Sequence, residues 1–506
     1  MDSNPKHPWY RSSVAQCAFA VCVIYHLFFA PWFAFNVALQ NDEGCYVAIL
    51  YKLLFQSSEG FCSGRINYFA PGAPFLWLPA GGFALALSSL SQLWLFHWLQ
   101  PILGLYSFCL FGAATYVLYL CVSRFLETPV SKIPTSPWLL TLAVILNSPI
   151  LYYAGTWAIM PHTAQILVAF VTVLLLERRK FFLAGLAVLL LSLTRFNDVP
   201  AILMLLGKAW DERSTWREGA ARLFHRKIAV FAVAALLLSV TVFIGWTAFV
   251  KGYGPTTLSN LFLSVSMAKL NFFLFHDRWG VFWMTPWWTL SFVFGLAHFR
   301  RLSNFARGAL VWLFIEGYVA TSWGGNGGDF GYRYLLGSFA AAWVIWKEVV
   351  ALHGPRFQKV FVGLSVVGAG WMTYLNIAYR SITELTPVMV QVPNAPPGTL
   401  VFGGLSHFQV EALKHVFDPN LYAGWFNRDF PLRQLWMIWV DLPDNPSVRG
   451  TDQLVLAISA LASLFYIVVF ARRNLSHFLA CRKASRKAGT EIPSASSAPP
   501  ESLSGP

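Results

Sequence analysis

Residues 14–46 read VAQCAFAVCVIYHLFFAPWFAFNVALQNDEGCY. The part from Val14 to Leu39 is apolar and exceeds the roughly 20 residues that a membrane-spanning helix needs. It is also longer than the roughly 7–15-residue core of a signal peptide, and no clear small-residue cleavage site accompanies it. We therefore predict a retained membrane anchor, with the adjacent carboxylates Asp42 and Glu43 directly after it.

The composition of the whole chain agrees with a membrane protein. Of its 506 residues, 56% are hydrophobic and only 12% are charged, with a mean hydropathy of +0.54. A soluble protein has about 25% charged residues. The net charge of +14 could suggest nucleic-acid binding, but the positive residues occur in short clusters between apolar runs. Cytoplasmic loops show this pattern, so we expect the lipid bilayer as a partner and no nucleic acid.

The apolar runs predict an all-α, polytopic fold of about twelve membrane-spanning helices. Residues 181–194 and 198–209 are short and could form a tight helical pair. Most of the 37 lysines and arginines then fall on the side of the N-terminus, which predicts cytoplasmic termini in a multi-pass protein of the inner or plasma membrane. The expected spans are 14–36, 99–123, 137–154, 160–177, 181–194, 198–209, 228–250, 279–298, 306–323, 332–349, 358–377 and 452–471.

The first outer loop covers about residues 40–98. Residues 46–55 have helix-like apolar spacing and predict a helix that lies in the membrane interface. Proline and glycine in residues 67–74 indicate a turn. Residues 75–90 are apolar but contain a proline and two glycines, so we expect a kinked interfacial or re-entrant segment. A thirteenth span is the alternative.

The cysteines and the short motifs narrow the chemistry. Cys45 and Cys62 share the first outer loop, and a disulfide between them stays open because the sequence does not give its geometry. No cysteine spacing resembles a zinc site. The chain has no Walker motif, GxGxxG loop or nucleophile elbow, which argues against ATP-driven transport and nucleotide-cofactor redox chemistry.

Every functional-looking polar cluster falls on the expected outer face. Charged residues at membrane depth are costly unless they are paired or line a wet cavity, so these clusters predict one polar cavity. Simpler explanations stand beside this one: Asp42 could cap a helix, Arg195 and Asp198 could pair structurally, and the glycine-rich loop 323–334 could be a connector. The clusters are Asp42 with Glu43, Arg195 with Asn197 and Asp198, His276 with Asp277 and Arg278, and Asp329 with Arg333.

The residue types in these clusters suit a lipid-linked phosphosugar. A carboxylate can take a proton from an acceptor hydroxyl. Arginines can hold a phosphate through forked, charge-assisted hydrogen bonds. Aromatic residues, which make up 17% of the chain, can stack on sugar rings, and apolar grooves between helices can take the lipid tail.

The chain divides into four expected parts. Residues 1–377 form a transmembrane domain with outer-face loops, and residues 378–450 form an outer-face cap, since they are too few for a comfortable independent domain. Residues 451–472 form the last transmembrane helix. Residues 473–506 form a cytoplasmic tail that is basic and then disordered, because it is rich in Ser, Pro and Ala.

The order of these features resembles the polytopic glycosyltransferases of the GT-C fold, the polyprenyl- or dolichyl-phosphate-sugar-dependent mannosyl- and aminoarabinosyltransferases. Asp42-Glu43 is similar to the acidic loop-one motif of that group, and residues 68–74 (YFAPGAP) to its aromatic-x-Pro-Gly-x-Pro turn. Residues 277–286 resemble an Arg-x-Gly-Leu-x-x-x-x-Pro stretch. Residues 323–335 resemble a Trp-x-Gly-Gly…Phe-Gly-Pro-Arg-Tyr-Leu loop, with a tyrosine in place of the proline. The resemblance covers roughly residues 15–350.

The resemblance implies an inverting transfer on the outer face, carried out by a GT-C-like catalytic domain. It makes Asp42 the general base and Glu43 a neighbour that orients Asp42 or helps to hold a divalent metal. The resemblance leaves open whether a divalent metal is needed and implies no other cofactor. It implies a polyprenyl-phosphate sugar donor and a glycan, lipid or protein acceptor. The expected donor phosphate ligands are Arg278, Arg333 and Arg195, and the expected substrate-binding residues are Tyr68, Asn197, Asp198, Trp323 and Asp329.

Two further functions remain open from the sequence. A transporter or flippase of a lipid-linked sugar could use the same cavity without catalysis, although it should place polar groups near the bilayer midplane. A non-catalytic assembly partner could dock through residues 378–450. The position of the polar clusters at outer helix ends favours the enzyme.

Overall fold

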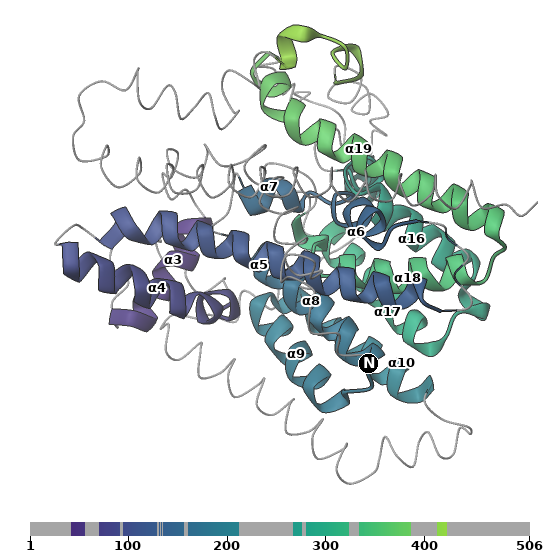
Figure 1. The fold of residues 1–506 in the computed structure, drawn as a ribbon, viewed down its shortest axis with the longest axis horizontal. Helices are drawn as coiled ribbons and strands as arrows, with labels where there is room; N and C mark the ends of the chain where they lie inside the picture. Colours follow the sequence, from purple (N-terminus) through teal and green to yellow (C-terminus); the bar gives the residue numbers. More distant parts are fainter. Residues whose placement is uncertain are drawn as a thin grey trace, which may run out of the picture. The chain divides into compact units, whose positions relative to one another are not determined.

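The computed structural model describes residues 42–55, 70–91, 95–128, 131, 133, 135–155, 160–211, 267–275, 280–322, 333–385 and 412–422, all within the unit Met1–Leu456. This part of the chain is all-helical, without a strand, which confirms the expected all-α class (Figure 1). Its helices are α3 (Asp42–Phe55), α4 (Gly72–Ser91), α5 (Leu95–Leu126), α6 (Pro137–Ile145), α7 (Ile150–Gly155), α8 (His162–Glu177), α9 (Phe181–Thr194), η3 (Phe196–Ala201), α10 (Ile202–Asp211), α14 (Met267–Phe275), α15 (Val281–Met284), α16 (Pro286–Ala297), η4 (Phe299–Arg301), α17 (Asn304–Ser322), η5 (Arg333–Leu335), α18 (Phe339–Ala351) and α19 (Pro355–Leu385).

In the described part of the chain, three helices are long and apolar enough to cross a membrane: Gly72–Ser91, Ile102–Leu126 and Pro355–Ala378. They agree with a membrane protein. Most of the other expected spans that fall on described residues also contain helices, whereas 14–36, 228–250 and 452–471 lie outside the described residues. The total of about twelve spans therefore stays a prediction.

Proline divides two of the expected spans. The run 137–154 forms α6 and α7, with Pro149 in the break, and the run 279–298 forms α15 and α16, with Pro286 opening the second helix. Proline has no amide hydrogen to donate and disfavours a helical residue before it. At the first break, Asn147 Nδ2 donates to the Ala143 carbonyl at 2.6 Å and to the Ser365 carbonyl of α19 at 2.5 Å. The break is therefore tied to a neighbouring helix.

Helices α10 and α17 pack closely because glycine lies on both sides of their contact. A Cβ on Gly207 would overlap the Asn304 carbonyl, and a Cβ on Gly308 would overlap the Leu203 carbonyl. Helix α17 also packs on α18, and α18 on α8 (Figure 1). Small residues allow such close approach, which is how membrane helices gain packing energy without a hydrophobic driving force.

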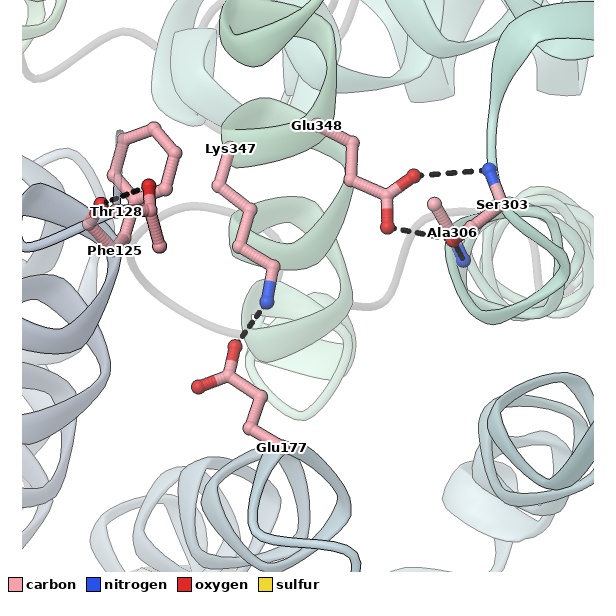
Figure 2. A network of polar contacts seen from close by, with 7 residues as sticks. All are labelled: Phe125, Thr128, Glu177, Ser303, Ala306, Lys347 and Glu348. Atoms are coloured by element: carbon pink, nitrogen blue, oxygen red, sulfur yellow. Dashed lines mark hydrogen bonds and ion pairs between the residues drawn. The ribbon is translucent and has the colours of Figure 1, made fainter. Parts of the chain in front are cut away.

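Helix α8 links two polar regions of this bundle. It has 16 residues, which is about 24 Å at roughly 1.5 Å per residue and approaches the roughly 30 Å of a bilayer hydrocarbon core. At its C-terminal end lies the base network, formed by Glu177, Ser303, Lys347 and Glu348 (Figure 2). Lys347 pairs with Glu177, and Glu348 accepts hydrogen bonds from the Ser303 amide at 3.0 Å and hydroxyl at 2.6 Å. These contacts join α8, α17 and α18.

The first outer loop differs in part from its prediction. Helix α3 forms as expected, but residues 44–50 are buried, and Tyr46 packs edge-on against Trp77 of α4. This part of α3 thus packs within the protein. Helix α4 continues without a break through Pro79 and the two glycines that follow it. Its length permits the alternative of a thirteenth span.

Helix α5 extends beyond the start of α8. The Ser107 hydroxyl lies 2.7 Å from the Thr163 hydroxyl near that start, so the first part of α5 reaches past it. Leu99 and Leu103 from this part form a second core with α3 and α4. Cys45 is disulfide-bonded, and the pairing with Cys62 stays open because Cys62 is not among the described residues.

The C-terminal part differs at one boundary. Helix α19 continues to Leu385, past the expected end at 377, so the cap segment 378–450 begins as helix. Ala412 and Leu421 are buried in the main core, and the Tyr374 hydroxyl donates to the Ala412 carbonyl. Residues 412–422 therefore pack on α19.

Candidate functional site

A buried cluster of polar side chains lies at the end of α8 opposite the base network. It brings together the start of α8, the end of α9, η3, the middle of α17 and η5. We call it the polar cluster. Its members are His162, Gln165, Arg195, Asn197, Asp198, Glu316, Arg333 and Tyr334.

The local sequence places three of these residues in a tight turn. Helix α9 ends at Thr194, and Arg195 is extended, with φ −149° and ψ 126°. A 3₁₀ turn follows in η3, where the Asp198 amide donates to the Arg195 carbonyl at 3.1 Å. Pro200 lacks an amide donor, which suits such a short helical turn better than a long helix. The expected span 198–209 therefore begins with η3, and α10 starts only at Ile202.

Hydrogen bonds connect Asp198 to α8. Gln165 Nε2 donates to Asp198 Oδ2 at 2.8 Å, and Gln165 Oε1 lies 3.2 Å from His162 Nδ1. Arg195 Nη1 lies 3.3 Å from the same His162 nitrogen. His162, Gln165 and Asp198 are fully buried. His162 Nδ1 can either donate to Gln165 or accept from Arg195, depending on its tautomer, whereas the bond from Gln165 holds Asp198 against α8.

Asn197 joins three elements with one amide group. Its Nδ2 donates to Glu316 Oε1 of α17 at 3.2 Å and to the Tyr334 carbonyl of η5 at 3.1 Å. Asn197 therefore holds η3, α17 and η5 in one arrangement. The side chain is half-buried, so these bonds are partly protected from water.

Two carboxyl groups meet inside the cluster. Asp198 and Glu316 are buried, and their carboxyl groups lie within hydrogen-bonding distance of each other. Asp198 lies in η3, in the connection between α9 and α10, and burial raises the pKa of its carboxyl to about 6. Two carboxylates this close repel each other when both are ionised, which favours one shared proton.

Two arginines flank the ring of Tyr334. The guanidinium carbon of Arg195 lies 4.6 Å from the ring centroid, and that of Arg333 lies 5.5 Å from it. Arg333 is 7% exposed, so its charge is largely removed from water. Cation–π contacts stabilise each guanidinium, and their forked donors suit a phosphate. This side of the cluster can therefore bind an anion.

The structure brings together four of the residues expected at the site: Arg195, Asn197, Asp198 and Arg333. Tyr68, Arg278, Trp323 and Asp329 lie outside the described residues, as do His276 and Asp277. Asp42 and Glu43 are the first two residues of α3. Their roles stay predictions.

The sequence analysis missed Glu316, His162, Gln165 and Tyr334. Glu316 had a usable signal, because it is the one carboxylate within the apolar run 306–323. An ionisable residue inside such a run usually has a functional partner. His162 and Gln165 have no comparable signal, since they follow a loop at a helix start. Among the described residues, no three His, Cys, Asp or Glu side chains are grouped so that they could hold a metal ion.

Fold and site together define an all-α membrane protein with a buried polar cluster at one end of a helix bundle. No protein-family model, curated protein or solved structure matches the chain.

Proposed function

We propose that the protein is an integral-membrane glycosyltransferase that moves a sugar from a polyprenyl-phosphate donor to an acceptor on the outer face of the membrane. The observation that supports this most is the meeting of Arg195 and Arg333 at the ring of Tyr334. The two arginines come from distant segments, and their paired charges suit the phosphate of such a donor.

The proposed reaction is a direct displacement. The acceptor hydroxyl attacks the anomeric carbon, the bond from that carbon to the phosphate oxygen breaks, and polyprenyl phosphate leaves. Asp42 accepts the hydroxyl proton, and Glu43 orients it. Arg195, Arg278 and Arg333 stabilise the negative charge on the leaving phosphate, which is the kind of electrostatic effect that usually contributes most to catalysis.

The proposed topology places the polar cluster outside and the base network inside the cell. Arg178, Arg179 and Lys180 follow α8 directly, at the end that carries the base network. Arg300 and Arg301 follow α16 in η4. Positive residues at this end agree with a cytoplasmic side. We extend this to cytoplasmic termini in a multi-pass protein of the plasma membrane.

A transfer assay in proteoliposomes tests the proposal. Arg333→Gln should reduce transfer from a polyprenyl-phosphate sugar by about 10²-fold or more, as expected for the loss of one strong transition-state contact. Arg356→Gln is the matched control, because Arg356 is exposed in the first turn of α19. Equal activity in both variants would refute the phosphate role. Mass spectrometry of glycolipids from cells with and without the protein identifies the sugar.

A transporter of a lipid-linked sugar is the second candidate. The observation that favours it is the buried Asp198–Glu316 pair, since buried carboxyl groups in helix bundles serve as proton relays in transporters. Flux of a lipid-linked sugar across vesicle membranes without chemical turnover would favour this function over the enzyme.

A further inference from the structure

One oxygen of the Asp198–Glu316 pair accepts no hydrogen bond from another group. Asp198 Oδ1 is buried and accepts no hydrogen bond from the described residues outside the pair, whereas the Ser338 hydroxyl and the Trp312 indole N–H can donate to the Glu316 carboxyl group. The opposite oxygens are bonded: Asp198 Oδ2 to Gln165, and Glu316 Oε1 to Asn197. Asp198 Oδ1 therefore lacks a donor outside the pair, and a single proton between the two carboxyl groups supplies the missing hydrogen.

The charged groups around the pair come from three elements. Arg195 faces Asp198 from the end of α9, His162 lies beyond Gln165 at the start of α8, and Arg333 lies in η5 next to Tyr334, whose carbonyl binds Asn197. The neutral side chains of Ser338 and Trp312 lie beside Glu316.

The other helices packed on η3 and α17 carry few charged residues. Lys208 and Asp211 lie in the last turn of α10, and Lys347 and Glu348 lie in the far half of α18, within the base network. Helix α16 has no ionisable residue, and the charged residue of α14 is Lys269. Within the described part of the chain, the pair and the two arginines are therefore the charged groups that meet in the polar cluster.

We infer that Asp198 and Glu316 form a proton-binding site, and that the proton they share allows Arg195 and Arg333 to take up one anion, such as the phosphodiester of the proposed donor. The proton removes one of the negative charges beside the two guanidinium groups, which favours the binding of an anion there. Without the proton, the second carboxylate competes for the arginines and repels an incoming anion. The anion named here rests on the proposed function, whereas the proton site does not.

Proton and anion binding are then linked. Each ligand strengthens the binding of the other by the same factor, because a coupling free energy is reciprocal. Anion affinity should fall as the pH rises through the range in which the pair loses its proton. Loss of the proton to the outer solution would favour release of the lipid phosphate after transfer.

Infrared spectroscopy tests the shared proton directly. Purified protein in nanodiscs should show the carbonyl stretch of a protonated, buried carboxyl group at pH 6, with a shift in D₂O. This band should be lost or displaced in both Asp198→Asn and Glu316→Gln. A wild-type spectrum without such a band, or a band unchanged in both variants, would overturn the proton site. The wild-type measurement needs no variant to fold.

Sulfate binding tests the coupling, because sulfate does not titrate between pH 5 and 8 and needs no sugar donor. Calorimetry in two buffers of different ionisation enthalpy should show uptake of up to one proton per sulfate in the wild-type protein. Above the pH of proton release, affinity should fall by about tenfold per pH unit, as expected for one linked proton.

Glu316→Gln should make sulfate affinity independent of pH, since the glutamine donates to Asp198 and leaves one carboxylate in place. Arg356→Gln should keep the wild-type dependence. A flat wild-type profile, a pH dependence that persists in Glu316→Gln and Asp198→Asn, or no sulfate binding at any pH would overturn the coupling. A coupled sulfate site in a protein without transferase activity would instead refute the proposed function alone.

Discussion

Replacement of Gly337 by alanine should loosen the polar cluster without changing any charge. The new Cβ would overlap Asp198 Oδ1 and would lie 2.8 Å from Gln165 Nε2, against 3.4 Å for ordinary contact. Asp198, Gln165 or the backbone at residue 337 must move, and the 2.8 Å bond between the two side chains lies in the way of any such movement. Losing that buried bond costs about 1–3 kcal/mol, and overpacking costs about 1–3 kcal/mol more.

The expected destabilisation for Gly337→Ala is therefore about 2–6 kcal/mol. Thermal unfolding in detergent measures it as a lower midpoint temperature, and the pH dependence of sulfate binding should weaken in the same variant. Gly363→Ala is the matched control, since a Cβ there on exposed α19 meets nothing within 4 Å. A Gly337→Ala protein as stable as the control, with unchanged sulfate binding, would refute the close packing of Gly337 on Asp198.

Three further predictions concern single residues. Asn197→Ala should cost about 1–3 kcal/mol in thermal stability and weaken sulfate binding, because it releases η5; Asn197→Asp, which lacks donors, should not restore either. Lys347→Met should lower stability by about 1–3 kcal/mol, since Glu177 is 10% exposed and loses its partner, and Glu177→Gln in addition should recover part of the loss. The free energy of unfolding should fall as the pH rises from about 4 to 6, because the pKa of Asp198 rises from 3.8 to about 6 on folding and the folded state then binds more protons than the unfolded state. Asp198→Asn should flatten this profile in thermal melts recorded at different pH values. A wild-type melting temperature that rises over this range would contradict the prediction.

Helix positions were largely predictable from the sequence. Helix α9 begins at Phe181 and ends at Thr194, as expected, because a charged cluster precedes the run and Arg195 follows it. A backbone in lipid must satisfy its hydrogen bonds within the helix, so an apolar run almost always forms one. The missed breaks at Pro149 and Thr285 come from proline, which such run-length arguments overlook.

The candidate site was predictable only in part. Arg195, Asn197 and Asp198 are neighbours along the chain, so their common turn could be predicted from local residues. The resemblance to the GT-C glycosyltransferases predicted Arg333 at the same site. Glu316 lies 119 residues beyond Asn197, and its partner could not be found from periodicity or composition.

The sequence by itself determined that this is an all-α membrane protein and which apolar runs of the described residues contain helices. Hydrophobicity and backbone hydrogen bonding act over one or two turns and can be seen along the chain. Only the tertiary structure decided that Asp198 meets Glu316 and that two arginines share the ring of Tyr334. These contacts depend on how α8, α9, η3, α17 and η5 pack. Buried polar groups form hydrogen bonds with groups that are close in space, even when those groups are distant in the sequence.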